Sequence, residues 1–175
     1  MVYTLTRQED KYMAKVKGMK KEAVYVSSEI FGRLMNSLYV NYGIYDVLGV
    51  VYQEIASRSK SQALGQYFTP FVVCEAMAKM TLGDIKGQIE IAKKEGKRFK
   101  VLDPCVGSGA MLLGAKKAII EEYGLAGLDY FEFYGMDIDP ICVNMAKVQM
   151  ALTDYRYMSD LLIGVAYDVL KKQKA

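Results

Sequence analysis

Histidine is absent from the 175 residues. Because histidine is the most common general base and a frequent metal ligand, its absence excludes a hydrolase of the Ser-His-Asp kind. Cysteine is also scarce, since Cys74, Cys105 and Cys142 are far apart and odd in number. This pattern predicts reduced thiols in a cytoplasmic protein, and neither a disulfide framework nor a metal site.

Long apolar runs are missing as well. No apolar stretch approaches the ~20 residues that a membrane-spanning helix needs, and the first residues (MVYTLTR) lack the pattern of a secretory signal. We therefore expect no membrane partner. Apolar residues nevertheless make up 52% of the chain and charged residues 25%, which is enough to bury a core in one domain-sized unit.

Charge of one sign is only slightly in excess, with a formal net charge of +3. Lysines cluster in residues 11–21, 93–100 and 171–174. Such clusters could contact phosphates, but solvated surfaces are the more ordinary interpretation of each cluster. Charge therefore does not by itself predict a nucleic-acid-binding protein.

Helical spacing dominates the first third of the chain. Residues 1–20 predict a loose arm or a short helix, and apolar residues at intervals of three and four predict two amphipathic helices between residues 22 and 59, joined near 41–43. Four tyrosines in this region could stack on bases, but a packed helix–helix seam is favoured. These tyrosines are Tyr39, Tyr42, Tyr45 and Tyr52.

The middle of the chain predicts alternating helices and strands. Thr69 and Pro70 predict a helix that starts with a hydroxyl cap and a proline in its first turn and runs to about Leu82. A charged stretch with Gly83, Gly87 and Gly96 then leads into the next elements. These are a strand at 99–103, a glycine turn at 107–109, a helix at 110–123, a strand at 130–137 and a helix that opens at 139–140. The spacing in 158–170 favours a helix, and a strand there remains open.

This order of elements is that of the front half of a doubly wound nucleotide-binding fold. Gly107 and Gly109 would let a ligand approach the backbone and would leave the first amides of the next helix free to donate. Asp137, at the end of the second strand, could accept hydrogen bonds from both hydroxyls of a ribose. Each of these signals is weak when taken singly.

Three motifs in order give a sharper prediction. Residues 103–109 (DPCVGSG) resemble the first motif of the N6-adenine DNA methylase family, and residues 64–70 (LGQYFTP) resemble the motif that precedes it. Residues 134–140 (YGMDIDP) match the second motif, and residues 46–54 (DVLGVVYQE) are similar to a helix in modification subunits of type I restriction systems. The resemblance covers about residues 45–150.

The resemblance implies a fold, a cofactor and a set of contacts. The fold would be α/β, a truncated Rossmann-like methyltransferase domain at residues 61–175 preceded by a small helical region at 1–60. The cofactor would be S-adenosylmethionine, with Asp137 on its ribose, Ile138 on its adenine and Asp139 as a helix cap. The family's motifs place the cofactor against Gln66, Tyr67, Thr69, Pro70, Asp103, Gly107, Gly109, Asp137 and Ile138.

The catalytic motif of the family, Asn/Asp-Pro-Pro-aromatic, does not occur in these residues. The three prolines, Pro70, Pro104 and Pro140, each lie inside another motif. We therefore expect no catalytic residue here, and we expect this chain without a partner to be inactive. A two-stranded sheet is also marginal in water, which predicts self-association or a second protein chain.

Three functions stay open. The chain could be the cofactor-binding portion of a DNA adenine-N6 methyltransferase of a restriction-modification system, reaching DNA through a complex. It could instead be a non-catalytic module that binds S-adenosylmethionine for regulation or interaction. Finally, it could be a structural remnant whose pocket no longer binds the cofactor.

Overall fold

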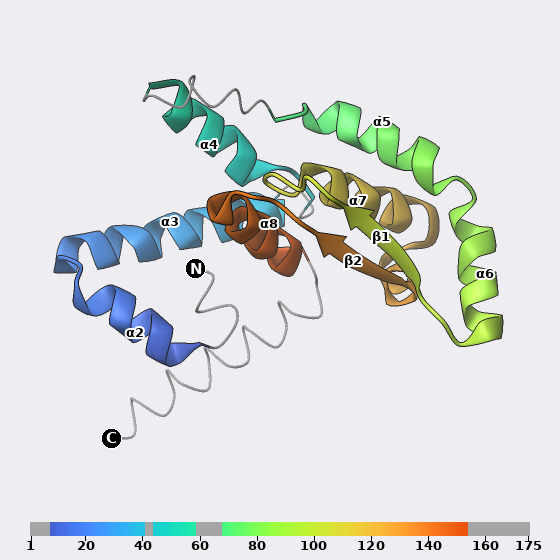
Figure 1. The fold of residues 1–175 in the computed structure, drawn as a ribbon, viewed down its shortest axis with the longest axis horizontal. Helices are drawn as coiled ribbons and strands as arrows, with labels where there is room; N and C mark the ends of the chain where they lie inside the picture. Colours follow the sequence, from blue (N-terminus) through green and yellow to red (C-terminus); the bar gives the residue numbers. More distant parts are fainter. Residues whose placement is uncertain (1–7, 41–43, 59–67, 154–175) are drawn as a thin grey trace. The chain divides into compact units, whose positions relative to one another are not determined.

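The computed structural model describes residues 8–40, 44–58 and 68–153 (Figure 1). By backbone contacts, the chain divides into two compact units. One unit comprises Ile44–Gln149, and the other comprises Met1–Gly43 together with Met150–Ala175. The domain boundary expected after residue 60 stays a prediction.

The unit Ile44–Gln149 holds both strands and most of the helices that the structure describes. Its helices before the first strand are α4 (Val47–Arg58), α5 (Phe71–Leu82) and α6 (Ile85–Glu95). The elements that follow in the chain are β1 (Phe99–Asp103), α7 (Ala110–Tyr123), the 3₁₀ helix η2 (Leu125–Tyr130), β2 (Phe131–Gly135) and α8 (Pro140–Leu152).

The two strands pair in parallel, with Phe99 opposite Phe131 and Asp103 opposite Gly135. Parallel strands need a crossover, and α7 supplies it (Figure 1). One face of the sheet packs into a core that α6, α7 and η2 complete. The fully or nearly buried members of this core are Ile85, Ile89, Ala118, Ile119, Leu128 and Phe131.

The other face of the sheet carries exposed side chains. Leu102 and Tyr134 are partners in the strand register and are both exposed. The Lys100 ammonium lies 5.9 Å from the centre of the Tyr134 ring. Within the described residues, this face therefore lacks the cover that parallel sheets ordinarily have on both sides.

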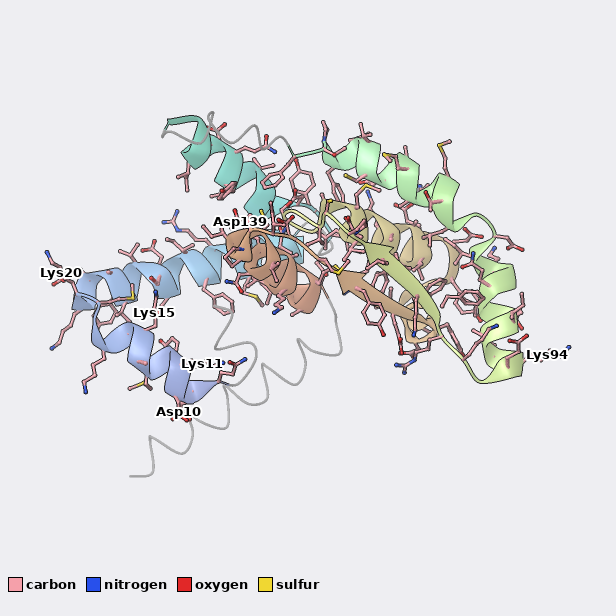
Figure 2. All side chains as sticks on the ribbon, viewed as in Figure 1. Asp10, Lys11, Lys15, Lys20, Lys94 and Asp139 are labelled. Carbon is pink, nitrogen blue, oxygen red and sulfur yellow. The ribbon has the colours of Figure 1, made fainter. Side chains whose placement is uncertain are left out.

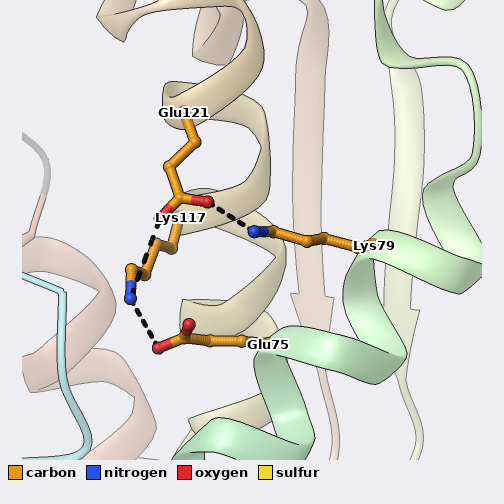
Figure 3. A network of polar contacts seen from close by, with 4 residues as sticks. All are labelled: Glu75, Lys79, Lys117 and Glu121. Carbon is orange, nitrogen blue, oxygen red and sulfur yellow. Dashed lines mark hydrogen bonds and ion pairs between the residues drawn. The ribbon is translucent and has the colours of Figure 1, made fainter.

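Helices α5 and α7 pack closely. A Cβ atom on Gly114 of α7 would lie 2.9 Å from the backbone carbonyl of Cys74 in α5, so only glycine permits this approach. Ion pairs join the same helices: Lys117 Nζ lies 2.6 Å from Glu75, and Lys79 Nζ lies 2.7 Å from Glu121 (Figure 3). The helix that precedes the strands is thereby fixed to the helix that connects them.

Most of the predicted elements are confirmed. The first strand, the helix at 110–123, the end of α5 near Leu82 and the second strand all lie where expected, although β2 is shorter than the predicted 130–137. The expected hydroxyl cap on α5 is wrong. The helix begins at Phe71 with Pro70 as its N-cap and no side-chain cap, because the ψ angle of Pro70 is 136° and therefore not helical.

Helix α6 was not predicted. Its glycines made residues 83–98 resemble a linker, yet Gly83 and Gly96 lie outside its two ends. Gly96 adopts the left-handed conformation that commonly terminates helices. The Asp84 carboxylate caps the start by accepting from the Gly87 amide, and Ile85, Ile89 and Ala92 form the buried face.

The described part of the other unit contains α2 (Glu9–Lys17) and α3 (Lys21–Val40). The short-helix alternative for the first residues is thus confirmed, as is the first amphipathic helix. The lysines labelled in this unit, Lys11, Lys15 and Lys20, are exposed (Figure 2). The tail, where helix and strand remained open, lies outside the described residues.

None of the described helices is long and apolar enough to cross a membrane.

Candidate functional site

The loop between β1 and α7 depends on two glycines. Gly107 has φ +51° and Gly109 has φ +100°, a backbone region that other residues rarely adopt. A Cβ atom on Gly107 would lie 3.2 Å from the Phe68 ring, and one on Gly109 would lie 3.1 Å from the Cα atom of Ala146. Backbone conformation and available space therefore both require glycine in this turn.

The loops that follow β1 and β2 remain hydrogen-bonded to each other beyond the strands. The Met136 amide donates to the Asp103 carbonyl at 3.0 Å, and the Val106 amide donates to the Met136 carbonyl at 2.8 Å. This pairing brings the end of β2 beside the glycine turn.

Asp137 is tied to the turn through its carboxylate. Its Oδ2 atom accepts from the Gly107 amide at 2.9 Å, and its Oδ1 atom accepts from the Asp139 amide at 2.9 Å. Each carboxylate oxygen can accept a second hydrogen bond. The half-buried Asp137 can therefore hold the turn and still bind two adjacent hydroxyl groups.

The other acidic and apolar residues of the two motifs have distinct environments. Asp103 Oδ1 accepts from the Cys105 amide at 3.0 Å and so shapes the start of the loop. Ile138 is fully exposed, at 101% of its reference area. Asp139, labelled in Figure 2, is confirmed as a helix cap because its Oδ1 atom accepts from the Ile141 amide at 2.8 Å.

The segment before α5 is described only in part. Thr69 and Pro70 are exposed at the start of that helix, whereas Gln66 and Tyr67 lie outside the described residues. Phe68, which was not among the expected site residues, lies against Gly107 and has its ring centre 5.6 Å from that of Tyr52. The Phe68 ring therefore covers one side of the turn at Gly107, and Tyr52 packs against that ring.

Tyr52 and Tyr45 are packed rings. Tyr45 makes an edge contact with Phe71 at 5.3 Å between ring centres, and Tyr52 packs on Phe68. These two rings pack on aromatic partners, but not as the expected seam between the helices of residues 22–59, because the partners Phe68 and Phe71 belong to the segment that begins α5. The side chain of Tyr39 and all of Tyr42 lie outside the described residues.

Near the start of α8, burial and nearby negative charge disfavour the ionised forms of Cys142 and Tyr52. Burial, with the nearby carboxylates of Asp137 and Asp139, raises the pKa of the Cys142 thiol to about 11. Burial, with the charges of Asp139 and Cys142, also raises the pKa of Tyr52. Both the thiol and the phenol therefore stay neutral at physiological pH.

A buried polar cluster lies behind the turn. Asp46 Oδ2 accepts from the Ser108 hydroxyl at 2.6 Å. Gln149 Nε2 donates at 2.8 Å both to Asp46 Oδ1 and to the Ser108 carbonyl. The exposed fractions of Asp46, Ser108 and Gln149 are 4%, 1% and 0%. None of the three was predicted as a site residue, because the contacts join segments far apart in the sequence.

Comparison with known proteins agrees with this architecture. A protein of Methanocaldococcus jannaschii, which carries the provisional name of a type II restriction enzyme and methyltransferase, is 26% identical over 160 aligned residues. The match covers 61% of this chain but only 14% of that protein. No solved structure matches the chain significantly. The family model described as N-6 DNA methylase matches residues 44–174, from the start of the unit that holds the glycine turn. The chain thus belongs to the N-6 DNA methylase family.

Proposed function

We propose that this chain binds S-adenosylmethionine at the glycine turn and forms the donor-binding portion of a DNA adenine-N6 methyltransferase of a restriction-modification system. The observation that carries the proposal is the bond between Asp137 and Gly107, 2.9 Å long, which joins the acid after β2 to the turn after β1. A nucleoside bound at the ends of parallel strands needs these two features side by side.

The described residues suit the parts of this cofactor. The two oxygens of Asp137 would accept from the ribose hydroxyls, and the exposed Ile138 would cover one face of the adenine. The first amides of α7 lack helical partners and suit the cofactor's carboxylate. Asp103 suits its ammonium group. By family resemblance, the segment with Gln66, Tyr67, Thr69 and Pro70 would close the amino-acid end.

When bound, S-adenosylmethionine supplies an electrophilic methyl group. The residues that would accept hydrogen bonds from the adenine amino group are not among these 175, because no two prolines are adjacent. We propose that they lie in further polypeptide, either in a longer chain or in a second one. The turn and Asp137 then hold the donor while the other part presents the DNA base.

The sheet supports the need for further polypeptide. The two strands that the described residues contain form a sheet that is marginal in water, and Leu102 and Tyr134 are exposed on the same face. A third strand, a second copy or a partner chain would cover these groups. Sedimentation at micromolar concentration should show association, and a stable, well-folded monomer would contradict this part of the proposal.

Calorimetric titration with S-adenosylmethionine tests the binding proposal. We expect heat of binding for the wild type, and Asp137→Ala should weaken the affinity by at least about tenfold, because a charge-assisted hydrogen bond is lost. Asp84→Ala is the control, since it removes an exposed helix-capping aspartate at the start of α6. If the wild type gives no heat, and Asp137→Ala changes nothing, the chain is a structural remnant.

Transfer of labelled methyl groups to DNA separates the enzyme from the alternative, a non-catalytic binding module for regulation or interaction. The assay is run with the chain by itself and with proteins that co-purify with it. We expect methylation only in the presence of the additional protein. Binding without transfer under any condition would favour the regulatory module.

A further inference from the structure

Behind the glycine turn, one buried carboxylate connects α4 to the turn. Asp46 Oδ1 accepts from the Gly49 amide at 2.9 Å, which caps the start of α4. Its Oδ2 atom accepts from the Ser108 hydroxyl at 2.6 Å. A buried carboxylate is stable only when donors replace the lost water, and here the donors come from α4, the turn and α8.

Gln149 completes the connection with both ends of its side-chain amide. Its Oε1 atom accepts from the Leu48 amide at 2.9 Å. Its Nε2 atom donates to Asp46 and to the Ser108 carbonyl, both at 2.8 Å. One side chain of α8 therefore contacts the start of α4 and the middle of the turn together.

These contacts determine the orientation of the peptide groups on which binding depends. The peptide unit between Ser108 and Gly109 is held at both ends, because its carbonyl accepts from Gln149 and its amide donates to the Val106 carbonyl at 2.7 Å. The Gly107 amide, two residues before that of Gly109, donates to Asp137. Glycines on both sides would otherwise let these peptide groups rotate freely.

We propose that Asp46 and Gln149 are positioning residues for the S-adenosylmethionine site. They hold Ser108 by its hydroxyl and its carbonyl, so that the turn and the first amides of α7 are in their binding geometry before the ligand arrives. This inference rests on the proposed function. It adds to that function a clamp formed by two buried side chains behind the turn.

The chain offers a matched control for the clamp. Asp84 caps α6 as Asp46 caps α4, with its Oδ1 atom 2.9 Å from the Gly87 amide, but Asp84 is exposed. Each aspartate is followed three residues later by glycine. Asp46→Asn and Asp84→Asn therefore perturb two similar caps, of which only one contacts the turn.

The test compares S-adenosylmethionine affinity by calorimetry for the wild type, Ser108→Ala, Asp46→Asn, Gln149→Met and Asp84→Asn. All measurements are made at a temperature where circular dichroism shows each variant folded. We expect Ser108→Ala and Asp46→Asn to bind about tenfold more weakly, as for the loss of one buried hydrogen bond, with Asp84→Asn unchanged. Ser108→Ala keeps the test decisive if Gln149→Met does not fold, because it removes only the hydroxyl.

A second measurement needs no ligand. In amide hydrogen exchange by NMR, Ser108→Ala and Asp46→Asn should speed exchange at Gly107 and Gly109, while Asp84→Asn should leave these amides unchanged. The clamp would be overturned if the wild type binds S-adenosylmethionine and if Ser108→Ala and Asp46→Asn have the same affinity and the same amide exchange rates as the wild type. A wild type that does not bind would overturn the proposed function, and the exchange measurement would still decide whether the clamp orders the turn.

Discussion

Gly109 and Ala146 are in direct backbone contact, because a Cβ atom on Gly109 would lie 3.1 Å from the Cα atom of Ala146. The glycine turn is thus packed against α8 as well as following β1. Since Gly109 also has φ +100°, a side chain at this position would meet both a conformational and a steric obstacle.

We therefore expect Gly109→Ala to lower the free energy of unfolding by about 2–5 kcal/mol, the sum of left-handed strain and overpacking. Gly96→Ala is the control, because Gly96 has φ +61° and its Cβ atom would meet nothing within 4 Å. That variant should lose only about 1 kcal/mol. Urea denaturation measures both, and equal losses would show that the Ala146 contact carries no energy.

The three thiols should differ sharply in reactivity. Cys105 is exposed in the turn, whereas Cys74 and Cys142 are buried and have raised pKa values. Because the thiolate is the reactive form, Ellman's reagent should modify Cys105 rapidly and the other two only after denaturation. Under the proposed function, S-adenosylmethionine should slow the reaction of Cys105, and rapid reaction of a buried thiol would contradict the packing around α5 or α8.

Stability should fall in mildly alkaline solution through Cys142. Burial raises the pKa of its thiol from 9.0 to about 11. A group whose folded pKa is raised contributes its stability below the unfolded pKa and loses that contribution as pH rises through the folded pKa. Between pH 9 and 11 the wild type should therefore lose more stability than Cys142→Ala, by at most about 3 kcal/mol.

Urea denaturation at several pH values measures this difference. The comparison with Cys142→Ala cancels the titration of groups that do not interact with Cys142, such as Cys74, whose pKa is also raised. Parallel stability curves for the two proteins across pH 9–11 would show that Cys142 does not titrate differently in the folded state.

The ion pairs between α5 and α7 should contribute little to stability. Lys79 and Glu121 are exposed, and Lys117 and Glu75 are 32% and 21% exposed, while hydrogen bonding to Lys79 lowers the pKa of Glu121. Exposed pairs are screened by water and salt. Lys117→Met, which keeps most of the aliphatic stem and removes the ammonium 5.8 Å from the centre of the Phe71 ring, should change the free energy of unfolding by at most about 1 kcal/mol.

The fully buried Ile119 of α7 provides the contrast. Ile119→Ala should lose about 2–5 kcal/mol, because it removes apolar contacts and leaves a cavity in the core between α6 and the sheet. Thermal or urea denaturation of Ile119→Ala and Lys117→Met shows which variant loses more unfolding free energy. A larger loss for Lys117→Met would mean that charge, not apolar packing, holds α7.

The sequence predicted the elements whose signals are local. Phe99–Asp103 is a short apolar strand followed by glycines, and Ala110–Tyr123 has continuous helical spacing, so both were placed correctly. The Asp139 cap was also predicted, because the side chain that caps a helix lies within a few residues of its amide.

Prediction from the sequence failed where several local signals competed, and where the residues in contact are far apart in the sequence. Gly83, Gly87 and Gly96 concealed α6, although Asp84 and the spacing of Ile85 and Ile89 marked it. The bond from Ser108 to Asp46 spans 62 residues, and that from Gln149 to Asp46 spans 103. No periodicity or motif in one segment indicates which polar residue of another segment will be buried beside it.

The pairing of Val106 and Met136 beyond the strands has a further consequence. Because those two loops continue the hydrogen-bonded ladder of the sheet, the turn cannot open without fraying the ends of β1 and β2. Local unfolding at the turn and at the sheet end is therefore one cooperative event. Anything that binds the closed turn therefore stabilises the ends of β1 and β2 by the same free energy, so the amides at that end of the sheet should gain protection from a ligand that contacts only the turn.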